Sequence, residues 1–368
     1  MKILILTNNV DGIYLFRKEL VQSYVKKGAE VVIALPKDGD FSKLEALGAR
    51  VVEVPMERRG MNPVKDGKLL MEYFKIIKKE RPKVVLTYTI KPNIYGGMAA
   101  SLMGVPYLVN ITGLGTAIQN GGLLADNLLK LYALSCKSAK CVFFQNKDNM
   151  SFMKKHKIGL GKSRLLPGSG VNLQEYPYTP YPSEENGIRI LSVFRIMKDK
   201  GIEEYLELIE NINETAYGSR LRFELIGEYE PETKEKYEPR IRSLVERGML
   251  KYYGYSREVF RIMGQSHIIL HPSYHEGLSN VLLEAASCGR PVLASYIPGC
   301  KETFRQGITG MGFLPQDERD IERALKEMLV KTEEERRHMG QMGRALMEKT
   351  FDRKFVLQAY EEEIRNIR

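Results

Sequence analysis

The sequence predicts an α/β protein made of two domains, each built around a parallel sheet. The chain has 368 residues, which is long for one domain and natural for two, and 43% of them are hydrophobic, enough for full cores. Its first 35 residues have the order strand, helix, strand, and a buried strand, a tight loop and a helix follow one another at 268–288. This alternation is typical of parallel sheets covered by helices.

The N-terminal half alternates short apolar runs with helical segments. Residues 2–7 form the first expected strand, residues 13–27 the first helix and residues 30–35 the second strand. The loop at 8–12 then lies at the carboxyl end of a strand, where open α/β sheets bind ligands. Further strands are expected at 51–54, 84–89, 107–111 and 141–145, and helices at 68–79, 94–103, 122–134 and 147–155.

Two loops of this half carry candidate binding residues. Lys91 and Asn93 follow the fourth expected strand. Lys91 there suits a substrate phosphate, although a solvated lysine fits the position as well. Thr112 and Gly113 follow the fifth expected strand, in a loop whose two glycines let the backbone approach a ligand closely.

The C-terminal half repeats the pattern after a segment rich in proline and tyrosine. Residues 173–187 are the expected linker. The strand at 188–194 is followed by three basic residues and by Gly201, from which a helix runs to residue 213. Further strands are expected at 222–227, 250–254, 268–270 and 291–295, and helices at 281–288, 320–329, 333–349 and 351–367.

The stretch 268–290 brings polar groups to the start of a helix. Ser279 and Asn280 are good N-cap residues, and the helix expected at 281–288 can end at Gly289. Free backbone N–H groups and the positive end of the helix dipole gather at such a turn, which suits a phosphate.

Two carboxylates bracket this turn. Glu276 lies in the loop, and Glu284 lies about one turn inside the helix. A carboxylate at Glu284 needs polar partners, because its neighbours leave little polar surface. Ligand hydroxyls would serve, and so would an arginine or a backbone N–H. The neighbours are Val281, Leu282, Leu283, Ala285 and Ala286.

The pair Glu276-x7-Glu284 resembles the E-x7-E signature of retaining glycosyltransferase family 4. The resemblance implies the GT-B fold, in which two Rossmann-like domains with parallel sheets face a central cleft and a C-terminal helix crosses back to the first domain. It also implies that Glu276 contacts the donor sugar and that Glu284 binds the ribose hydroxyls. The donor diphosphate would lie on the segment between them, which is Gly277, Leu278, Ser279 and Asn280.

Two further motifs resemble the same family. Arg195 and Lys200, just before Gly201, resemble its Gly-Arg…Lys-Gly motif and would set two positive charges against the diphosphate. Solvated basic residues are the alternative, which the spacing to Gly201 disfavours. The family binds the nucleotide base near the position of Tyr253 and Gly254.

Other parts match the family less closely. Gly12 is the remaining member of a glycine pair whose loop faces the donor in the family, and an ordinary βα loop explains it equally well. Residues 165–172 resemble the family hinge, and Gly299 and Glu302 resemble its Gly-x-x-Glu motif. The loop 112–116 lacks the histidine of many members, as in relatives that add N-acetylhexosamines to polyprenyl-diphosphate sugars.

Positive charge is concentrated in the first half of the chain. Residues 1–175 hold 27 Lys+Arg against 14 Asp+Glu, a net +13, and residues 176–368 hold 29 against 32, a net −3. No nucleic-acid-binding signature accompanies the basic clusters, such as Arg58-Arg59, so an anionic membrane surface is the expected partner. The helices expected at 68–79 and 122–134 suit an interface, although packing on a sheet explains most such helices.

The sequence favours the cytosol. Its four cysteines form no C-x-x-C pair, the first apolar run is too short for a signal peptide, and no run of about 18 apolar residues exists. Together with the basic half, this predicts a protein that is peripheral on the inner face of the cytoplasmic membrane.

The resemblance predicts a retaining glycosyltransferase. A UDP-hexose or UDP-N-acetylhexosamine would give its sugar to a hydroxyl of a polyprenyl-diphosphate-linked sugar in bacterial surface glycan or glycoprotein assembly. No cofactor and no metal is expected, since no D-x-D motif stands at a strand end. Donor binding falls to residues 188–349, and acceptor binding to residues 1–172 with 350–368. The expected catalytic residues are Glu276, Arg195 and Lys200, and the expected acceptor-binding residues are Lys91, Asn93, Thr112 and Gly113.

Three alternatives stay open. The acceptor could be a soluble sugar. A nucleotide-sugar 2-epimerase shares the fold, but it would need acidic and histidine residues in the first domain, where His156 is the single histidine. A non-catalytic binding protein should have lost Arg195, Lys200 or one glutamate of the pair.

Overall fold

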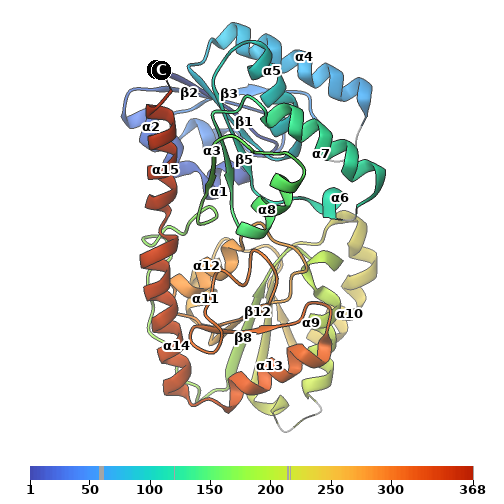
Figure 1. The fold of residues 1–368 in the computed structure, drawn as a ribbon. Helices are drawn as coiled ribbons and strands as arrows, with labels where there is room; N and C mark the ends of the chain where they lie inside the picture. Colours follow the sequence, from blue (N-terminus) through green and yellow to red (C-terminus); the bar gives the residue numbers. More distant parts are fainter. Residues whose placement is uncertain (58–61, 120, 214, 216, 368) are drawn as a thin grey trace. The chain divides into compact units, whose positions relative to one another are not determined.

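The chain forms two compact units. The computed structural model describes residues 1–57, 62–119, 121–213, 215 and 217–367. Unit 1 consists of Met1–Ser169 and Lys354–Arg368, and unit 2 of Gly170–Arg353. Each unit holds one parallel sheet flanked by helices (Figure 1). The basic pair Arg58-Arg59 lies outside the described residues.

The segment expected as a linker, 173–187, packs within unit 2. Arg290 is buried and donates to the carbonyl oxygen of Thr179 at 3.2 Å and to that of Pro180 at 2.9 Å. The chain passes from one unit to the other at residues 169–170 and again at residues 353–354.

The sheet of unit 1 has seven parallel strands among the described residues. Their order is β3-β2-β1-β4-β5-β6-β7, so the winding direction reverses between β1 and β4. All six strands expected in this half are confirmed, and the short edge strand β7 was not expected. The strands are β1 (Lys2–Leu6), β2 (Glu30–Leu35), β3 (Arg50–Glu53), β4 (Val84–Tyr88), β5 (Tyr107–Ile111), β6 (Cys141–Phe144) and β7 (Ser163–Leu165).

Both faces of this sheet are buried, as expected of a parallel sheet. Successive residues of β1 serve different cores, because Ile3 and Ile5 pack in one cluster and Leu4 and Leu6 in the other. The helices of the unit are α1 (Val10–Phe16), α2 (Lys18–Lys26), α3 (Ser42–Glu45), α4 (Pro63–Glu80), the π-helical turn η1 (Pro92–Gly96), α5 (Gly97–Leu102), α6 (Thr116–Gln119), α7 (Gly122–Cys136) and α8 (Lys147–Lys155).

The loop expected at 8–12 is shorter than the sequence suggested. Helix α1 already begins at Val10, because the Asn9 side chain caps it by accepting the N–H of Gly12 at 2.5 Å. A Cβ at residue 12 would lie 2.5 Å from the same Asn9 oxygen. Gly12 therefore leaves room for the cap.

The single helix expected at 13–27 is divided into α1 and α2 at Arg17. The Arg17 side chain is buried, its guanidinium donates to the carbonyl oxygen of Phe16 at 2.7 Å, and its Cζ lies 5.3 Å from the centre of the Tyr88 ring. The Arg17 side chain turns into the core, and the backbone leaves the helical conformation at this residue, so the helix is interrupted there.

The sheet of unit 2 has six parallel strands among the described residues, in the order β10-β9-β8-β11-β12-β13. Five of them were expected, and β13 was not. The strands are β8 (Ile188–Val193), β9 (Leu221–Ile226), β10 (Leu250–Tyr252), β11 (Ile268–His271), β12 (Val292–Ser295) and β13 (Gly310–Phe313). The helices are η2 (Lys198–Lys200), α9 (Ile202–Asn213), η3 (Gly218–Arg220), η4 (Pro231–Thr233), α10 (Lys234–Glu246), α11 (Val259–Gly264), α12 (Asn280–Ser287), α13 (Glu318–Val330), α14 (Glu333–Leu346) and η5 (Met347–Phe351).

The end of the chain returns to unit 1, as expected. Helix α15 (Arg353–Arg365) follows η5, and its buried residues join the core of unit 1 beside β1 and β2. The Tyr360 ring stacks at 4.7 Å from the Phe143 ring of β6, and its hydroxyl donates to Asn110 of β5.

A buried ion pair ties the expected linker to the helices of unit 2. Arg336 of α14 donates to Glu184 at 2.8 Å, and both side chains are almost inaccessible. The same guanidinium donates to the carbonyl oxygen of Met328 at 3.1 Å, near the end of α13. Arg336 thus satisfies one buried carboxylate and one helix end at once.

Replacing this cation should cost far more stability than replacing its exposed neighbour. Arg336→Met leaves the Glu184 charge buried, and we expect unit 2 to lose roughly 3–5 kcal/mol of unfolding free energy. The control is Arg337→Met, which breaks an exposed pair with Glu333 and should cost less than about 1 kcal/mol. Urea unfolding followed by circular dichroism measures both, and equal shifts of the two midpoints would contradict this account.

Candidate functional site

The turn between β11 and α12 leaves the start of α12 without a side-chain cap. Ser279 stands at the N-cap position but makes no capping bond, because its Oγ lies 3.2 Å from His271 Nε2. The Ser279 N–H is held by the carbonyl oxygen of Gly299 at 2.8 Å. The N–H groups of the first helical turn have no acceptor within the helix, so this end suits an anionic group.

Glu276 lies in this turn between two basic side chains. Its Oε1 accepts from Lys200 Nζ at 2.6 Å and lies 3.0 Å from His271 Nε2. Burial opposes the charge, but Lys200 and His271 outweigh it and hold the pKa of the Glu276 carboxyl well below its usual value. Glu276 is therefore a charged, fixed acceptor at neutral pH.

Two glycines allow the loops of this site to approach one another. Gly201 has φ +74°, and a Cβ there would collide with the carbonyl oxygen of Pro272. Gly299 has φ +90°, and a Cβ there would lie 2.6 Å from the carbonyl oxygen of Glu276. The residues after β8 and β12 are thereby packed against the turn that carries Glu276, which places Lys200 next to it.

Arg195 lies apart from this pair. Its side chain is 59% exposed and forms an ion pair with Glu230, and the described residues show no bond from it to Glu276 or Lys200. The sequence predicted that Arg195, Lys200 and Glu276 all act on the donor; in the structure Lys200 and Glu276 are in contact, whereas Arg195 pairs with Glu230. Arg195 would have to leave Glu230 to meet an anion at Lys200.

The Tyr253 side chain, expected near the nucleotide base, is bonded to a carboxylate of the protein. Its hydroxyl donates to Glu224 Oε2 at 3.1 Å, and Glu224 is held in turn by Arg189. Gly254 has φ +64°, and its carbonyl oxygen accepts the N–H of Gly227 at 2.9 Å. At this position, contact with a base would fall to the backbone of Tyr253 and Gly254.

Glu284 is a weakly compensated carboxylate inside α12. Burial raises the pKa of Glu284 to about 7, although the charge of Arg353 and the hydroxyl of Tyr176 oppose the rise. The two glutamates of the E-x7-E pair are therefore in different states near neutral pH, one firmly charged and the other half protonated. On the same helix, the Oδ1 atom of Asn280 is buried without a partner.

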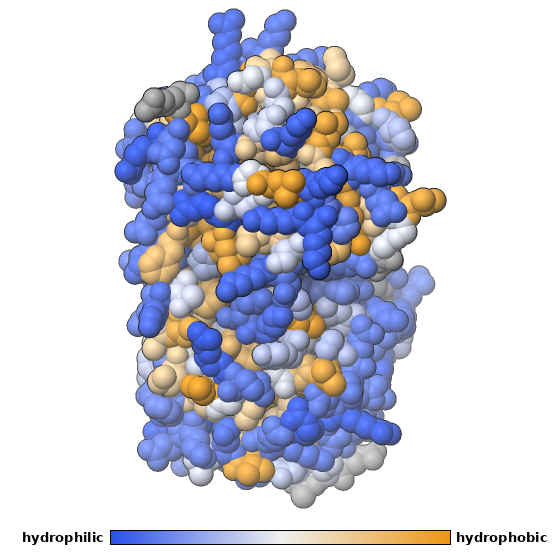
Figure 2. Space-filling view, in the orientation of Figure 1, coloured by the Kyte–Doolittle hydropathy of each residue, from blue (hydrophilic) through white to orange (hydrophobic). Residues whose placement is uncertain are grey.

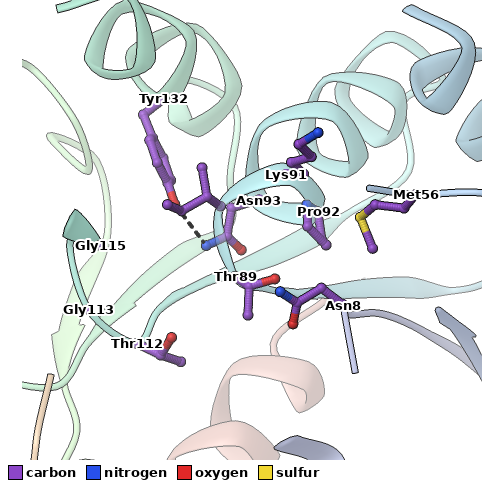
Figure 3. A pocket seen from close by; sticks show the side chains of 11 residues that line it. Asn8, Met56, Thr89, Lys91, Pro92, Asn93, Thr112, Gly113, Gly115 and Tyr132 are labelled. Atoms are coloured by element: carbon purple, nitrogen blue, oxygen red, sulfur yellow. Dashed lines mark hydrogen bonds between the residues drawn. The ribbon is translucent and has the colours of Figure 1, made fainter. Parts of the chain in front are cut away.

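The four residues expected to bind an acceptor line one pocket of unit 1. This cavity of about 260 Å³ lies where β1, β4 and β5 end (Figure 3). Asn8, Met56, Thr89, Ile90, Pro92, Gly115 and Tyr132 line it together with Lys91, Asn93, Thr112 and Gly113. Gly12 is not among the lining residues.

Two of the four are already engaged within the protein. Lys91 Nζ pairs with Asp66 Oδ1 at 2.8 Å, and both side chains are largely buried. The Asn93 amide donates to the carbonyl oxygen of Asn110 at 2.8 Å and accepts from the Thr87 hydroxyl at 2.8 Å. The charge of Lys91 in the pocket is therefore neutralised by Asp66, and Asn93 fixes the pocket wall through its bonds to Thr87 and Asn110.

Sequence reasoning missed His271 and Thr89. His271 could have been found, because it is a polar residue at the end of a buried strand five residues before Glu276. Thr89 lines the pocket of unit 1 with a positive φ of +72°, and nothing in the sequence around it signals this backbone conformation. No group of His, Cys, Asp and Glu arranged to hold a metal occurs in the part of the chain that the structure describes.

The raised pKa of Glu284 predicts a pH-dependent stability. An unfolded glutamate ionises near pH 4.5, whereas the folded one does so near pH 7, so stability falls as the pH rises through this window. Glu284→Gln should remove this loss of stability. At pH 8 its unfolding free energy should exceed that of the unchanged protein by about 1–2 kcal/mol, and its unfolding temperature should be higher.

Thermal unfolding at pH 5 and pH 8 measures the effect. The two proteins should differ much less at pH 5, and Glu185→Gln, at an exposed glutamate of unit 2, serves as the control. A difference between Glu284→Gln and the unchanged protein that is the same at both pH values would exclude the raised pKa.

Two family models match the chain, one in each half. The model "Glycosyl transferase 4-like" matches residues 2–146, and "Glycosyl transferases group 1" matches residues 180–346. Together they span most of unit 1 and of unit 2, including both glutamates of the E-x7-E pair.

Two characterised relatives align over most of the chain. An N,N'-diacetylbacillosaminyl-diphospho-undecaprenol α-1,3-N-acetylgalactosaminyltransferase from Campylobacter jejuni is 25% identical over 89% of each chain. A UDP-Gal:α-D-GlcNAc-diphosphoundecaprenol α-1,3-galactosyltransferase from Escherichia coli is 26% identical over 68% of this chain and 67% of its own.

The fold also matches solved structures. Anabaena HepE, crystallised with UDP and glucose, superimposes with a TM-score of 0.79 over 99% of both chains at 16% identity. At this identity the likeness establishes the fold, which is GT-B. Because the two family models match the two halves of the chain in order, the protein is a glycosyltransferase whose first half is of the glycosyl transferase 4-like type and whose second half is of the group 1 type.

Proposed function

We propose that the protein transfers a hexose or N-acetylhexosamine from a UDP-sugar to a hydroxyl of a polyprenyl-diphosphate-linked sugar, with retention at the anomeric carbon. The observation that carries the donor half is the Lys200–Glu276 pair beside the uncapped start of α12. The acceptor half is supported by two relatives whose names give undecaprenol-diphosphate-linked sugars as their substrates. Anabaena HepE, which shares the fold, was crystallised with UDP and glucose and supports UDP as the carrier.

The donor would bind to unit 2. Its diphosphate would lie at the first turn of α12, where Lys200 adds a positive charge and Arg195 adds another after leaving Glu230. Lys200 would donate to the phosphate while keeping its bond to Glu276 Oε1, and Glu276 would accept from sugar hydroxyls through its other oxygen. Glu284 would accept from the ribose hydroxyls, which favour its ionised form.

The reaction needs no metal in this proposal. The bond between the anomeric carbon and the β-phosphate oxygen breaks, and the acceptor oxygen bonds to the same face of that carbon. The acceptor proton passes to the departing phosphate, where it neutralises the negative charge that the oxygen gains when the bond breaks. Lys200 and the N–H groups of α12 stabilise the negative charge that develops on this phosphate.

Two other functions are less well supported. The relatives that align over most of the chain are transferases, which favours transfer over 2-epimerisation. A non-catalytic role is disfavoured, because Lys200 and Glu276 are present and already in contact. Transfer to a soluble sugar is the remaining alternative within the class.

We further propose that unit 1 binds the inner face of the cytoplasmic membrane through α7. The apolar stripe of α4 is used in the core, where Leu69, Tyr73 and Ile77 are buried. By contrast, α7 leaves Leu123 84% exposed and Leu134 58% exposed. Figure 2 shows hydrophobic side chains among an otherwise largely hydrophilic surface on unit 1. No described helix is both long and apolar enough to cross a membrane.

A UDP-release assay tests the proposed reaction. Purified protein is given a panel of UDP-sugars with and without a detergent-solubilised polyprenyl-diphosphate-linked N-acetylhexosamine. We expect release that requires one UDP-sugar and the lipid together. Release with water or a soluble sugar alone would reject the lipid acceptor.

The same assay tests the donor site. Glu276→Ala and Lys200→Met should each lower kcat/KM by about 10²–10³-fold, because each removes a group placed to act on the reacting sugar phosphate. Glu302→Gln, which changes a supporting residue one loop away, is the comparison and should cost less. Full turnover by Glu276→Ala would reject the site.

Vesicle binding tests the membrane surface. Leu123→Asp combined with Leu124→Asp should weaken binding to phosphatidylglycerol vesicles, measured by co-sedimentation, by about 10²-fold or more, since each buried apolar side chain contributes roughly 1.5–3 kcal/mol. The control is Val330→Asp, an exposed apolar residue of unit 2. Equal binding by both variants would remove α7 from the interface.

A further inference from the structure

Thr89 has a strained backbone at the end of β4. Its φ is +72°, in the left-handed region that glycine prefers and that a β-branched residue rarely adopts. The π-helical turn η1 (Pro92–Gly96) begins three residues later, and such turns are rare overall but frequent at functional sites. Two unusual backbone conformations therefore stand next to each other in unit 1.

The surrounding bonds hold Thr89 in this conformation. Its carbonyl oxygen accepts the N–H of Asn93 at 2.9 Å. The Asn93 side chain is fixed in turn by Thr87 and by the carbonyl oxygen of Asn110, each at 2.8 Å. A strained residue that its neighbours fix so firmly is typical of a binding or catalytic position.

This backbone conformation places the Thr89 hydroxyl where the described residues provide no hydrogen-bond partner. Thr89 Oγ1 is buried and has no hydrogen-bond partner. Thr89 also lines the cavity of unit 1, beside Asn8 from the neighbouring strand end (Figure 3). Buried hydroxyls are nearly always hydrogen-bonded, so this one points to a group that enters the cavity.

The chemistry of the cavity favours a neutral ligand. Among the described residues that line it, Lys91 is the one charged side chain, and Asp66 balances its charge at 2.8 Å. The rest of the wall combines hydroxyl and amide groups with apolar surface from Met56, Pro92 and the Tyr132 ring. Such a mixture suits the hydroxyls and the carbon face of a sugar ring, whereas a diphosphate would need uncompensated positive charge.

We propose that the cavity binds the sugar ring of the acceptor and that Thr89 Oγ1 hydrogen-bonds one of its hydroxyls. The acceptor diphosphate then lies outside this cavity, and Lys91 positions the cavity wall through Asp66. This inference rests on the proposed function, because it names the part of the acceptor that unit 1 recognises.

Two variants at one position test the inference. Thr89→Val keeps the shape and the branched Cβ but removes the hydroxyl, and it should raise the acceptor KM about tenfold while the donor KM changes less than twofold. Thr89→Ser keeps the hydroxyl and should restore most of the acceptor affinity. A rise in the donor KM instead would assign the cavity to the donor sugar and overturn the proposal.

Thermal unfolding separates binding from structure. Because the hydroxyl has no partner in the protein, Thr89→Val should not lower the unfolding midpoint. Thr89→Gly relieves the positive φ and should raise the midpoint while acceptor affinity is lost. A lower midpoint for Thr89→Val would show a structural role for the hydroxyl and overturn the proposal.

A binding experiment keeps this proposal distinct from the proposed reaction. Methyl α-N-acetylglucosaminide and methyl α-N-acetylgalactosaminide are titrated against the full chain by saturation-transfer NMR, without donor or lipid. A signal that is present with the unchanged protein and Thr89→Ser and lost with Thr89→Val supports the cavity, even if no lipid-linked sugar is glycosylated. No signal with the unchanged protein, or equal signals with all three, overturns it.

Discussion

The ion pair between Lys200 and Glu276 is the interaction on which the donor site depends. It joins the turn η2, which follows the first strand of unit 2, to the turn before α12, at 2.6 Å and largely out of solvent. A charge of either sign alone would be costly there, so each residue fixes the other. The close approaches at Gly201 and Gly299 make the pair geometrically possible, because a side chain at either glycine would force the loops apart. The Lys200–Glu276 pair is thus in place before any ligand arrives, whereas Arg195 is still paired with Glu230.

The donor turn could be predicted because its information is local. The spacing of Glu276 and Glu284, the N-cap residues between them and the Lys200-Gly201 dipeptide all lie within short stretches of sequence. The strands of both sheets were predictable for a similar reason, since buried parallel strands are continuous apolar runs. Strand β7 has only three residues, and two of the four residues of β13 are glycines, so neither forms a continuous apolar run.

What the sequence did not reveal are partners far apart in the chain. Lys91 was expected to face a phosphate, but Asp66, 25 residues earlier, balances its charge. Arg195 was expected beside Lys200, but Glu230, 35 residues later, holds it. The backbone of Thr89 is set by Asn93 and its bonds to a neighbouring strand, and a threonine in a sequence gives no hint of a positive φ.

The two units therefore present different chemistry to their ligands. Unit 2 offers charge and helix N–H groups around Glu276, as a sugar diphosphate requires, and unit 1 offers a balanced cavity with an unused hydroxyl at Thr89. This division fits the proposed transfer from a charged donor to an acceptor that unit 1 holds through its sugar. On this account the excess positive charge of the first half of the chain has no direct role in the proposed acceptor pocket.

A double-mutant cycle at Lys200 and Glu276 tests the central claim most directly. The kcat/KM for transfer is measured for the unchanged protein, Lys200→Met, Glu276→Gln and the double variant. If the two residues act as one unit on the donor, the double variant should lose little more than the worse single variant. Losses that multiply would mean that Lys200 and Glu276 act independently, and would contradict the account of the site given by their contact.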